Sequence, residues 1–185
     1  LQPIRETNPL FKVAPPATAQ GECLVLDLPA KWPEYVSRLN KSLRYEVRRT
    51  DKEPYLSGEA RIECARTPEE LLGAFERFLT LHSQRWRKRG LPGAFALPGR
   101  QALHRRWLAE AAEHERAFFL TLWHGGDPKG VLYGMRTNGR TYFYQSGFDP
   151  GASALSPGTV LVSSAIRMAI EWGDREFDFL RGNEP

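Results

Sequence analysis

The sequence predicts a mixed α/β (α+β) domain with a mostly antiparallel sheet and helices on both of its faces. Strand-like runs separated by turn residues over 117–148 predict an antiparallel meander of three strands. A long apolar helix at about 157–172 then leads to a further strand at 177–180. Because this crossover joins two strands of one sheet through a helix, we expect the two strands to be parallel. We expect the last strand to lie inside the sheet.

The residues before the meander supply the other elements. The segment 1–22 contains four prolines and no periodic pattern, so we expect a linker or extended arm, followed by one domain over 23–185. Residues 24–28 predict a short strand, and residues 59–65, which alternate between apolar and polar, predict another. Between them, a proline near a helix start and apolar residues at helical spacing predict one helix over about 33–52.

Two amphipathic helices are predicted before the meander. The first begins at residues 67–70, Thr-Pro-Glu-Glu, because threonine caps a helix, proline suits its first position and acids suit its positive end. Gly90 ends this helix. The second helix covers about 100–114. Within the meander, Asn138-Gly139 predicts a tight hairpin, since both residues tolerate the positive φ that such a turn needs.

Composition and charge narrow the possible classes of function. The chain has 185 residues, a formal net charge of +4 and a pI near 9.2, which permits an anionic ligand and does not demand nucleic acid. We expect no membrane span, because no stretch approaches about 18 uninterrupted apolar residues. Cys23 and Cys64 lie in apolar surroundings and are predicted to be buried, reduced thiols of a cytoplasmic protein. The four histidines lack zinc-binding spacing, so we expect no metal.

The start of the apolar helix is a candidate anion site. Ser156 is a good N-cap residue and Pro157 fits the first helical position, while Gly158 has no side chain where a ligand could approach the backbone. Free N–H groups and the helix dipole favour an anion, such as a phosphate, at this end. The alternative is an ordinary capped helix without a ligand.

Four segments carry a likeness to a known family. They are LHSQRWRKRG at 81–90, YFYQSGFDP at 142–150, SPG at 156–158 and FDFLRGNEP at 177–185. In this order and at these separations, the sequence resembles the GNAT acyltransferases, and in particular the CelD-type branch that is related to FemAB-like transferases. The resemblance covers about 23–185, and the order of elements matches the GNAT fold from its first strand to its fifth.

The resemblance implies a thioester donor, acetyl-CoA or another acyl-CoA, bound where the last meander strand and the following helix part. It implies that the pantetheine arm pairs with the strand edge at about 140–147 and that the pyrophosphate lies at about 155–160. The family's glycine-rich loop is replaced here by Ala-Leu-Ser-Pro-Gly at 154–158. The residues that the resemblance implies for donor binding are Gln145, Ser156, Gly158, Thr159 and Val160.

The resemblance also implies that the domain is C-terminally incomplete. In the family, the motif that ends here at Pro185 continues into a further helix and strands that complete the cleft. We therefore expect the chain to be part of a longer protein.

Tyr144 is a candidate catalytic residue. By strand alternation it shares one face with Tyr142 and Ser146, whereas Phe143 and Gln145 share the other. Its hydroxyl could donate a proton to a leaving thiolate. The alternative is a core tyrosine that walls the cleft and has a satisfied hydroxyl.

Asp178 is the second candidate catalytic residue. It alternates with Phe177 and Phe179 and could orient or deprotonate an amine acceptor. The alternative is a structural carboxylate paired with Arg181 or with a backbone N–H. Arg181 and Glu184 follow the carboxyl end of the strand, where ligands of α/β sheets commonly lie, so they are candidates for substrate binding or for a salt bridge.

Two basic segments are candidates for recognising the acceptor or an anionic partner. Arg85 and Trp86 belong to a basic helix end that borders the acceptor side in GNAT folds; the alternative is a solvated helix end with Trp86 packed inward. The second segment aligns several of its cations on one helix face, which is either solvated or binds RNA. Its basic residues are Arg38, Lys41, Arg44, Arg48 and Arg49.

The leading hypothesis is a GNAT-type N- or O-acyltransferase that moves an acyl group from acyl-CoA to an amine or hydroxyl of a small molecule or cell-envelope precursor. One alternative is a FemAB-like transferase that takes an aminoacyl group from charged tRNA, which the second basic segment favours. Another is a non-catalytic GNAT-like domain in envelope polysaccharide assembly. Such a domain would fill its own cleft, and the candidates for this plug are Leu155, Tyr144 and Phe148.

Overall fold

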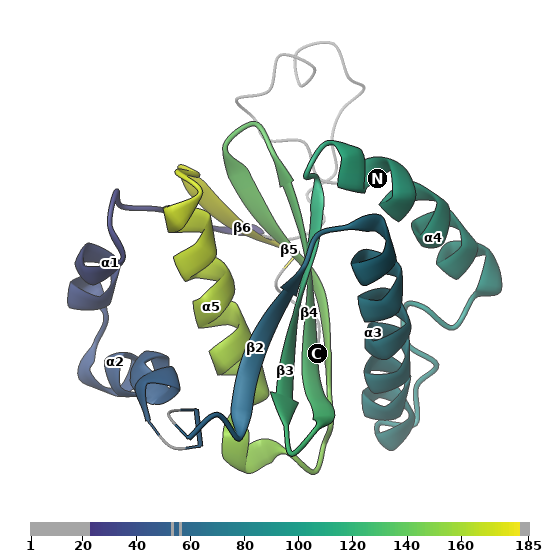
Figure 1. The fold of residues 1–185 in the computed structure, drawn as a ribbon, viewed down its shortest axis with the longest axis horizontal. Helices are drawn as coiled ribbons and strands as arrows, with labels where there is room; N and C mark the ends of the chain where they lie inside the picture. Colours follow the sequence, from purple (N-terminus) through teal and green to yellow (C-terminus); the bar gives the residue numbers. More distant parts are fainter. Residues whose placement is uncertain (1–22, 53, 56, 182–185) are drawn as a thin grey trace.

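Six strands form one sheet at the centre of the molecule (Figure 1). The computed structural model describes residues 23–52, 54–55 and 57–181, so the arm predicted at 1–22 lies outside the described residues. The strands are β1 (Cys23–Asp27), β2 (Ala60–Ala65), β3 (Ala117–His124), β4 (Asp127–Thr137), β5 (Arg140–Phe148) and β6 (Glu176–Arg181). Their order across the sheet is β1-β6-β5-β4-β3-β2, and β5–β6 is the parallel pair.

The sheet confirms the predicted fold class. Strands β3, β4 and β5 are the expected antiparallel meander, and its second turn places Asn138 and Gly139 at positive φ, 53° and 70°. The crossover from β5 to β6 makes the expected parallel pair, and β6 lies between β1 and β5 as an interior strand. The short strand predicted at 24–28 is therefore the edge partner of the last strand of the sheet.

Helices cover both faces of the sheet (Figure 1). The helices α3 (Pro68–Lys88) and α4 (Pro98–Glu113) cover one face, whereas α5 (Pro157–Glu171), α1 (Trp32–Arg38) and α2 (Lys41–Val47) lie on the other. The start of α3 has the predicted cap: Thr67 Oγ1 accepts from the Glu70 N–H at 3.3 Å, and Glu70 Oε2 accepts from the Thr67 N–H at 3.2 Å. The backbone N–H groups of Arg66 and Thr67, which both donate to the Glu70 carboxylate, lower the pKa of Glu70.

The single helix predicted over 33–52 is wrong, because the chain forms two helices there. Leu39 is extended, with ψ of 147°, and ends α1. Asn40 then starts α2, and its side-chain oxygen accepts the Leu43 N–H at 2.9 Å. A short 3-10 turn, η2 (Arg48–Asp51), follows α2. The apolar spacing continues across the break, so periodicity alone did not reveal it.

The core has one layer on each side of the sheet. Between the sheet and α3/α4, the layer is rich in aromatic rings, among them Phe75, Phe78 and Tyr133, all with no exposed surface. Between the sheet and α5, the layer is mainly aliphatic. The stretch Ser153–Glu171 is long and apolar enough to cross a membrane by length and composition alone. In this fold it contains the core helix α5, whose Val160, Ala165 and Ala169 are fully buried.

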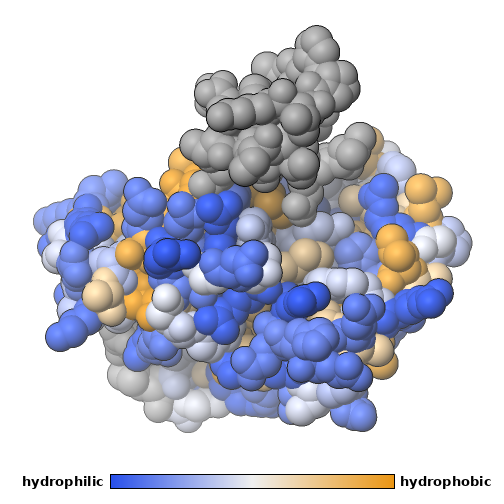
Figure 2. All heavy atoms as spheres, turned by 90° about the horizontal axis from the view of Figure 1, so that it is seen from above, coloured by the Kyte–Doolittle hydropathy of each residue, from blue (hydrophilic) through white to orange (hydrophobic). Residues whose placement is uncertain are grey.

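The two cysteines are half-buried thiols and not the fully buried ones that were predicted. The reason is their place in the sheet, since Cys23 lies in β1 and Cys64 in β2, the two edge strands. Burial still raises the pKa of Cys64. The outer surface is mostly hydrophilic on the face in Figure 2, with apolar residues in small separate groups.

Candidate functional site

Strands β5 and β6 are paired at one end and apart at the other. Their register joins Arg140 to Glu176, Thr141 to Phe177 and Tyr142 to Asp178, and it stops there. Within the described part of the chain, residues 143–148 of β5 have strand partners only on the β4 side. An unpaired strand edge offers backbone N–H and C=O groups to an extended ligand.

A buried charge network fixes the end where the two strands pair. Asp174, in the turn before β6, has a side chain with no exposure and accepts from Arg136 Nε at 3.0 Å and from Thr141 Oγ1 at 2.6 Å. Arg136 belongs to β4 and Thr141 to β5, so one carboxylate ties the entry of β6 to both strands. The pairing is held at this end, and the strands separate beyond it.

Strand β5 contains a β-bulge at Tyr144. Tyr133 of β4 pairs with Gln145 and the next residue, Gly134, pairs with Phe143, so Tyr144 is an extra residue. Residues paired across strands share a face of the sheet, and Tyr133 belongs to the core under α3. Tyr144 and Gln145 therefore both point toward α3 and α4. This corrects the prediction that strict alternation places them on opposite faces.

The bulge also reassigns Ser146. It pairs with Leu132 of the aliphatic layer, so it points toward α5 and not along with Tyr144 as alternation predicted. The side-chain oxygen of Gln145 accepts the Ser146 N–H at 3.0 Å. The Gln145 side chain thus bonds to the backbone of its own strand, within the half of β5 that has no β6 partner. Its role in donor binding stays a prediction.

Tyr144 is joined to a second tyrosine by a histidine that the sequence did not single out. His104 Nε2 lies 3.2 Å from the Tyr144 hydroxyl, and His104 Nδ1 lies 3.0 Å from the Tyr133 hydroxyl. His104 belongs to α4, whereas Tyr133 and Tyr144 belong to β4 and β5. The three side chains make one hydrogen-bonded row between the helix and the sheet.

Hydrogen-bond accounting assigns the protons of this row. Tyr133 is fully buried and His104 is its hydroxyl's partner among the described residues, so its O–H must donate to Nδ1 or stay unsatisfied. A neutral imidazole that accepts at Nδ1 carries its proton on Nε2 and donates it to the Tyr144 oxygen. Tyr144 then keeps its own O–H proton for another acceptor.

The pKa shifts keep all three groups neutral near pH 7. Burial, and then the nearby Arg100, lowers the pKa of His104. Burial strongly raises the pKa of Tyr133, and the neighbouring Tyr144 raises it further. Burial also raises the pKa of Tyr144, partly offset by Arg100. Neutral side chains are what the assigned donors and acceptors require.

His104 had one readable signal in the sequence. It is four residues before Leu108 and seven before Ala111, and all three are buried on one face of α4. Its apolar neighbour Leu103, by contrast, is 65% exposed. A polar residue in the apolar stripe of a helix needs a partner on the packed element, and that partner is set by tertiary structure.

Asp178 has structural contacts. Its Oδ1 accepts the Leu180 N–H at 2.8 Å, and its Oδ2 lies 3.9 Å from Arg140 Nη1. Leu180 has a positive φ of 55°, so the carboxylate holds a turn of the backbone at the end of β6. Asp178 pairs with Tyr142 and shares its face, at the closed end of β5–β6.

The start of α5 differs from the predicted cap. Ser156 is the N-cap residue but has φ 47° and ψ 53°, in the left-handed region, and its hydroxyl does not cap the helix. Its backbone N–H instead closes the 3-10 turn η3 (Ser153–Leu155), donating to the Ser153 carbonyl at 3.0 Å. A left-handed residue other than glycine is strained, and such strain gathers at functional sites.

Two backbone N–H groups at this helix start have no hydrogen-bond partner among the described residues and can serve a ligand. The Val160 N–H donates to the Ser156 carbonyl at 3.0 Å, and the Val160 side chain is fully buried. Neither group of Val160 can therefore contact an acyl-CoA. Pro157 has no N–H, which leaves Gly158 and Thr159 as residues without an intrahelical partner. A Cβ on Gly158 would meet no atom within 4 Å, so the space beside it is open.

The helix start is pressed against the sheet beside the end of β5. A Cβ on Gly130 of β4 would lie 3.0 Å from Pro157 Cβ, 2.9 Å from Leu161 Cδ1 and 3.6 Å from Phe148 Cβ. Gly130 pairs with Phe148, the last residue of β5. The open half of β5 and the free N–H groups of α5 are therefore neighbours.

The predicted acceptor residues Arg85 and Trp86 end α3 close to the same place. The Arg85 guanidinium lies 4.5 Å from the centroid of the Phe148 ring. Trp86 packs inward, with its ring 5.9 Å from that of His82 and its N–H buried without a hydrogen-bond partner among the described residues. Arg181 is the last residue of β6, but its side chain, like Glu184, lies outside the described residues.

The second basic segment is partly structural. Arg44 donates to the carbonyl of Leu39 at 2.9 Å, to that of Ser37 at 3.1 Å and to that of Val36 at 3.3 Å. These are carbonyls at the end of α1, so the guanidinium caps that helix. Arg44 is thereby held by its own fold, which weakens the idea of a free basic face for RNA.

The three residues proposed as a plug have other contacts. Tyr144 hydrogen-bonds to His104, the Phe148 ring stacks with the Arg85 guanidinium, and Leu155 packs against the aliphatic layer. Within the described residues there is no group of three or more histidine, cysteine, aspartate or glutamate side chains placed to hold a metal.

We expect the free energy of unfolding to fall as the pH drops from about 7.5 to 5, because of His82. Burial and the nearby Arg85 lower its pKa from 6.5 to about 4, and the side chain is 1% exposed. Between these values the unfolded chain binds a proton that the folded chain does not, which favours unfolding. The loss is about 2 kcal/mol over this range.

Urea unfolding at both pH values, with a His82→Gln variant alongside, checks this. The difference in unfolding free energy between the two proteins should shrink at the lower pH. An equal difference at both pH values would show that His82 titrates normally in the folded protein.

The chain is similar to known proteins in sequence motif and in fold. The family model described as the acetyltransferase (GNAT) domain matches residues 38–185. No curated protein sequence matches the chain. Among solved structures, a GCN5-related N-acetyltransferase from Ralstonia eutropha JMP134 aligns with a TM-score of 0.53 and 18% identity, over 68% of this chain and 84% of that one. An aminoglycoside acetyltransferase from an uncultured soil metagenomic sample, in complex with sisomicin, aligns with a TM-score of 0.52 and 14% identity, over 70% and 81%.

A longer structural relative covers more of the chain. It is the C-terminal domain of a protein from Agrobacterium fabrum assigned as a lysylphosphatidylglycerol synthetase, with a TM-score of 0.54 and 15% identity. The alignment covers 88% of this chain and 46% of that domain, so the chain spans about half of its length. At these identities the likeness to each structure is one of fold.

Proposed function

The chain belongs to the family of GNAT acetyltransferase domains, and on that premise we propose that it moves an acyl group from acyl-CoA to an amine or hydroxyl. The acceptor would be a small molecule or a cell-envelope precursor, and the reaction would take place in the cytoplasm. Assignment to the CelD-type or FemAB-like branch stays a prediction.

One observation carries the proposal: the open half of β5 ends beside the free N–H groups of α5. The pantetheine arm of the donor is an extended amide chain that can pair with a strand edge at 143–148. A pyrophosphate can accept from the N–H groups of Gly158 and Thr159, where the helix dipole favours an anion. The residues present thus fit a coenzyme A donor in chemistry and in order along the chain.

Catalysis would rest on positioning and on proton transfer. The acceptor nitrogen or oxygen attacks the thioester carbonyl and releases one proton to solvent, the carbon–sulfur bond breaks, and the leaving thiolate takes up one proton. We assign the proton donor to Tyr144, whose O–H stays free because His104 donates to its oxygen. Asp178 would orient the acceptor, since its own contacts with Leu180 and Arg140 hold it in place.

Thermal unfolding with coenzyme A and acetyl-CoA tests the donor. Ligand at about 100 times its Kd adds roughly 2.7 kcal/mol to the free energy of unfolding. For a domain of this size the midpoint should rise by about 5–10 °C. Adenosine 3′,5′-bisphosphate, which lacks the pantetheine arm, should give a smaller rise.

The result separates the candidate donors. A rise with acetyl-CoA supports the acyltransferase. If neither ligand raises the midpoint and charged tRNA binds instead, the aminoacyl transferase replaces it. If no donor binds, the non-catalytic domain is the better account.

A further inference from the structure

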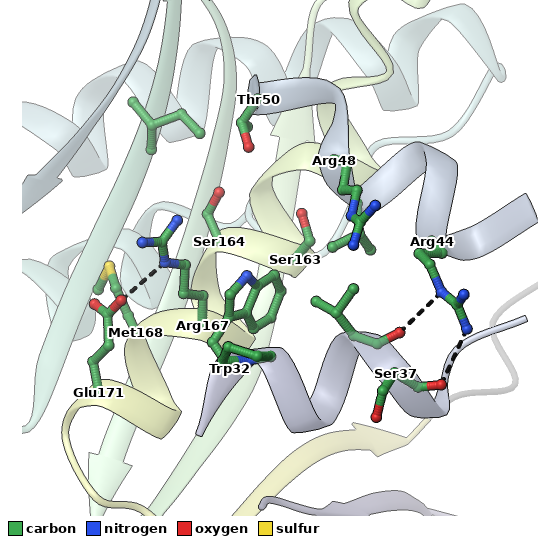
Figure 3. A pocket seen from close by; sticks show the side chains of 14 residues that line it. Trp32, Ser37, Arg44, Arg48, Thr50, Ser163, Ser164, Arg167, Met168 and Glu171 are labelled. Atoms are coloured by element: carbon green, nitrogen blue, oxygen red, sulfur yellow. Dashed lines mark hydrogen bonds and ion pairs between the residues drawn. The ribbon is translucent and has the colours of Figure 1, made fainter. Parts of the chain in front are cut away.

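A pocket of about 620 Å³ lies between the N-terminal helices and α5 (Figure 3). Its walls come from α1, α2, η2 and α5, and Ile62 of β2 closes one side. This volume is within the range of about 300–1,000 Å³ that small-molecule sites occupy. Strand β2 is an edge strand separated from β5 by β4 and β3, and the pocket residues of α5 begin at Ser163, beyond the helix start proposed for the donor.

Its walls are held by fixed contacts. Arg44 bonds three carbonyls of α1 and its end, which locks α2 against α1. On α5, Arg167 Nε donates to Glu171 Oε1 at 2.9 Å (Figure 3). Because Arg44 fixes α2 against α1, these two walls are in place before a ligand arrives, which lowers the entropy lost on binding.

The lining combines an apolar body with a few polar groups. Two hydroxyls are already used: Ser163 donates to the Val160 carbonyl at 3.0 Å and Ser37 to the Glu34 carbonyl at 2.7 Å. Within the described part of the chain, the hydroxyls of Thr50 and Ser164 make no hydrogen bond. The apolar lining residues are Trp32, Pro33, Val36, Val47, Ile62 and Met168.

The charge balance of the pocket is positive. It contains the guanidinium groups of Arg44, Arg48 and Arg167 and one carboxylate, Glu171. That carboxylate is paired with Arg167, while Arg48 makes no ion pair within the described residues. In Figure 3 the labelled Arg48, Ser163, Ser164 and Thr50 are among the side chains that line the pocket. A pocket whose lining carries this excess of guanidinium groups together with unused hydroxyls favours a carboxylate or phosphate.

We propose that this pocket binds a small amphipathic anion, with its carboxylate or phosphate on Arg48, Thr50 and Ser164 and its apolar body against Trp32 and Val36. The anionic head group is complementary to the positive charge of the pocket and can accept hydrogen bonds from the unused hydroxyls. The apolar part covers surface that the fold leaves uncovered at the edge of the sheet. This site is independent of the proposed donor site.

Calorimetry with octanoate, octyl phosphate, octanol and acetate tests the proposal on the full chain. Octanoate and octyl phosphate should bind, and the stronger of the two identifies the head group. Octanol lacks the charge and acetate lacks the apolar body, so each should bind at least about tenfold more weakly. Equal binding of octanol and octanoate would overturn the proposal, as would no binding of either anion.

Matched variants locate the ligand. Arg48→Gln should weaken octanoate binding about tenfold, and Arg48→Lys should restore part of it. Arg106 is an exposed arginine on α4, on the other face of the sheet, and Arg106→Gln should leave binding unchanged. Ser164→Phe should fill the pocket; if it fails to fold, the Arg48 pair carries the test.

Two outcomes would show that octanoate does not bind in this pocket. An equal loss with Arg106→Gln would mean a general charge effect. Displacement of octanoate by coenzyme A would mean that the anion occupies the donor site. Because octanoate binding is measured without a donor, its failure leaves the acyltransferase proposal untouched.

Discussion

Replacing Gly158 with glutamate is expected to weaken coenzyme A binding by more than about 100-fold while leaving the free protein at least as stable. Gly158 is the second residue of α5, and an added Cβ meets no atom within 4 Å, so the fold accepts the side chain. Glutamate is a better helix former than glycine, and an acid in the first turn suits the helix dipole. The same carboxylate would lie where we place the pyrophosphate and would repel it.

The chain offers a matched control for this variant. Helix α4 also begins with proline and glycine, Pro98 and Gly99, and a Cβ on Gly99 likewise meets no atom within 4 Å. Gly99→Glu makes the same change at the same helical position of α4, a helix that supplies none of the N–H groups proposed for the pyrophosphate. Calorimetry with coenzyme A and thermal unfolding without it should be run on both variants.

The expected pattern is specific. Gly158→Glu should lose the coenzyme A signal and keep its unfolding midpoint, whereas Gly99→Glu should keep both. Retained affinity in Gly158→Glu would place the donor elsewhere, and equal losses in both variants would point to net charge and not to the site.

Gly147→Ala is expected to destabilise the protein by about 3 kcal/mol or more. A Cβ at this position would lie 2.5 Å from the backbone nitrogen of His82 and 2.9 Å from its Cα. These are backbone atoms of α3, so no side chain can rotate away, and the helix would have to move off β5. Gly147 therefore sets the distance between α3 and the strand that carries Tyr144.

Gly73→Ala is the matched control, because Gly73 lies within α3 itself. Its added Cβ would meet only Arg77 Nη1, at 3.5 Å, which is an ordinary contact with a flexible side chain. Alanine in a helix is favoured over glycine by roughly 1 kcal/mol, so this variant should be more stable than the parent protein. Urea unfolding measures both. A Gly147→Ala protein as stable as the parent would mean that α3 and β5 do not approach so closely.

These experiments depend on parts of the fold that the sequence could predict to different degrees. The element order, the parallel crossover to an interior β6 and the capped start of α3 followed from local patterns. Apolar periodicity, turn residues such as Asn138-Gly139 and the cap at Thr67 act over a few residues. Local chemistry of this kind decides the same structure in almost any fold.

The family also followed from the sequence, because four short segments that resemble it occur in the expected order along the chain. The two elements that meet at the candidate donor site, β5 and the start of α5, are consecutive in the chain, so their meeting could be expected. Their exact conformations could not. Ser156 was expected to cap α5 through its hydroxyl, but the preceding 3-10 turn forces it into the left-handed region.

What tertiary structure decided involves residues far apart in the chain. His104 joins Tyr133 and Tyr144, which are 29 and 40 residues away, and no local pattern pairs them. The bulge at Tyr144 arises from a register shift between β4 and β5. It turns the Gln145 side chain toward α3 and α4, whereas strict alternation places it on the opposite face. By itself, then, the sequence determined the order of the strands, most of the helices and the family, because these depend on short-range periodicity, capping and local motifs, whereas the break between α1 and α2 escaped it. The facing of side chains at the site was decided only by packing, because it depends on strand register and on hydrogen bonds that close across the core.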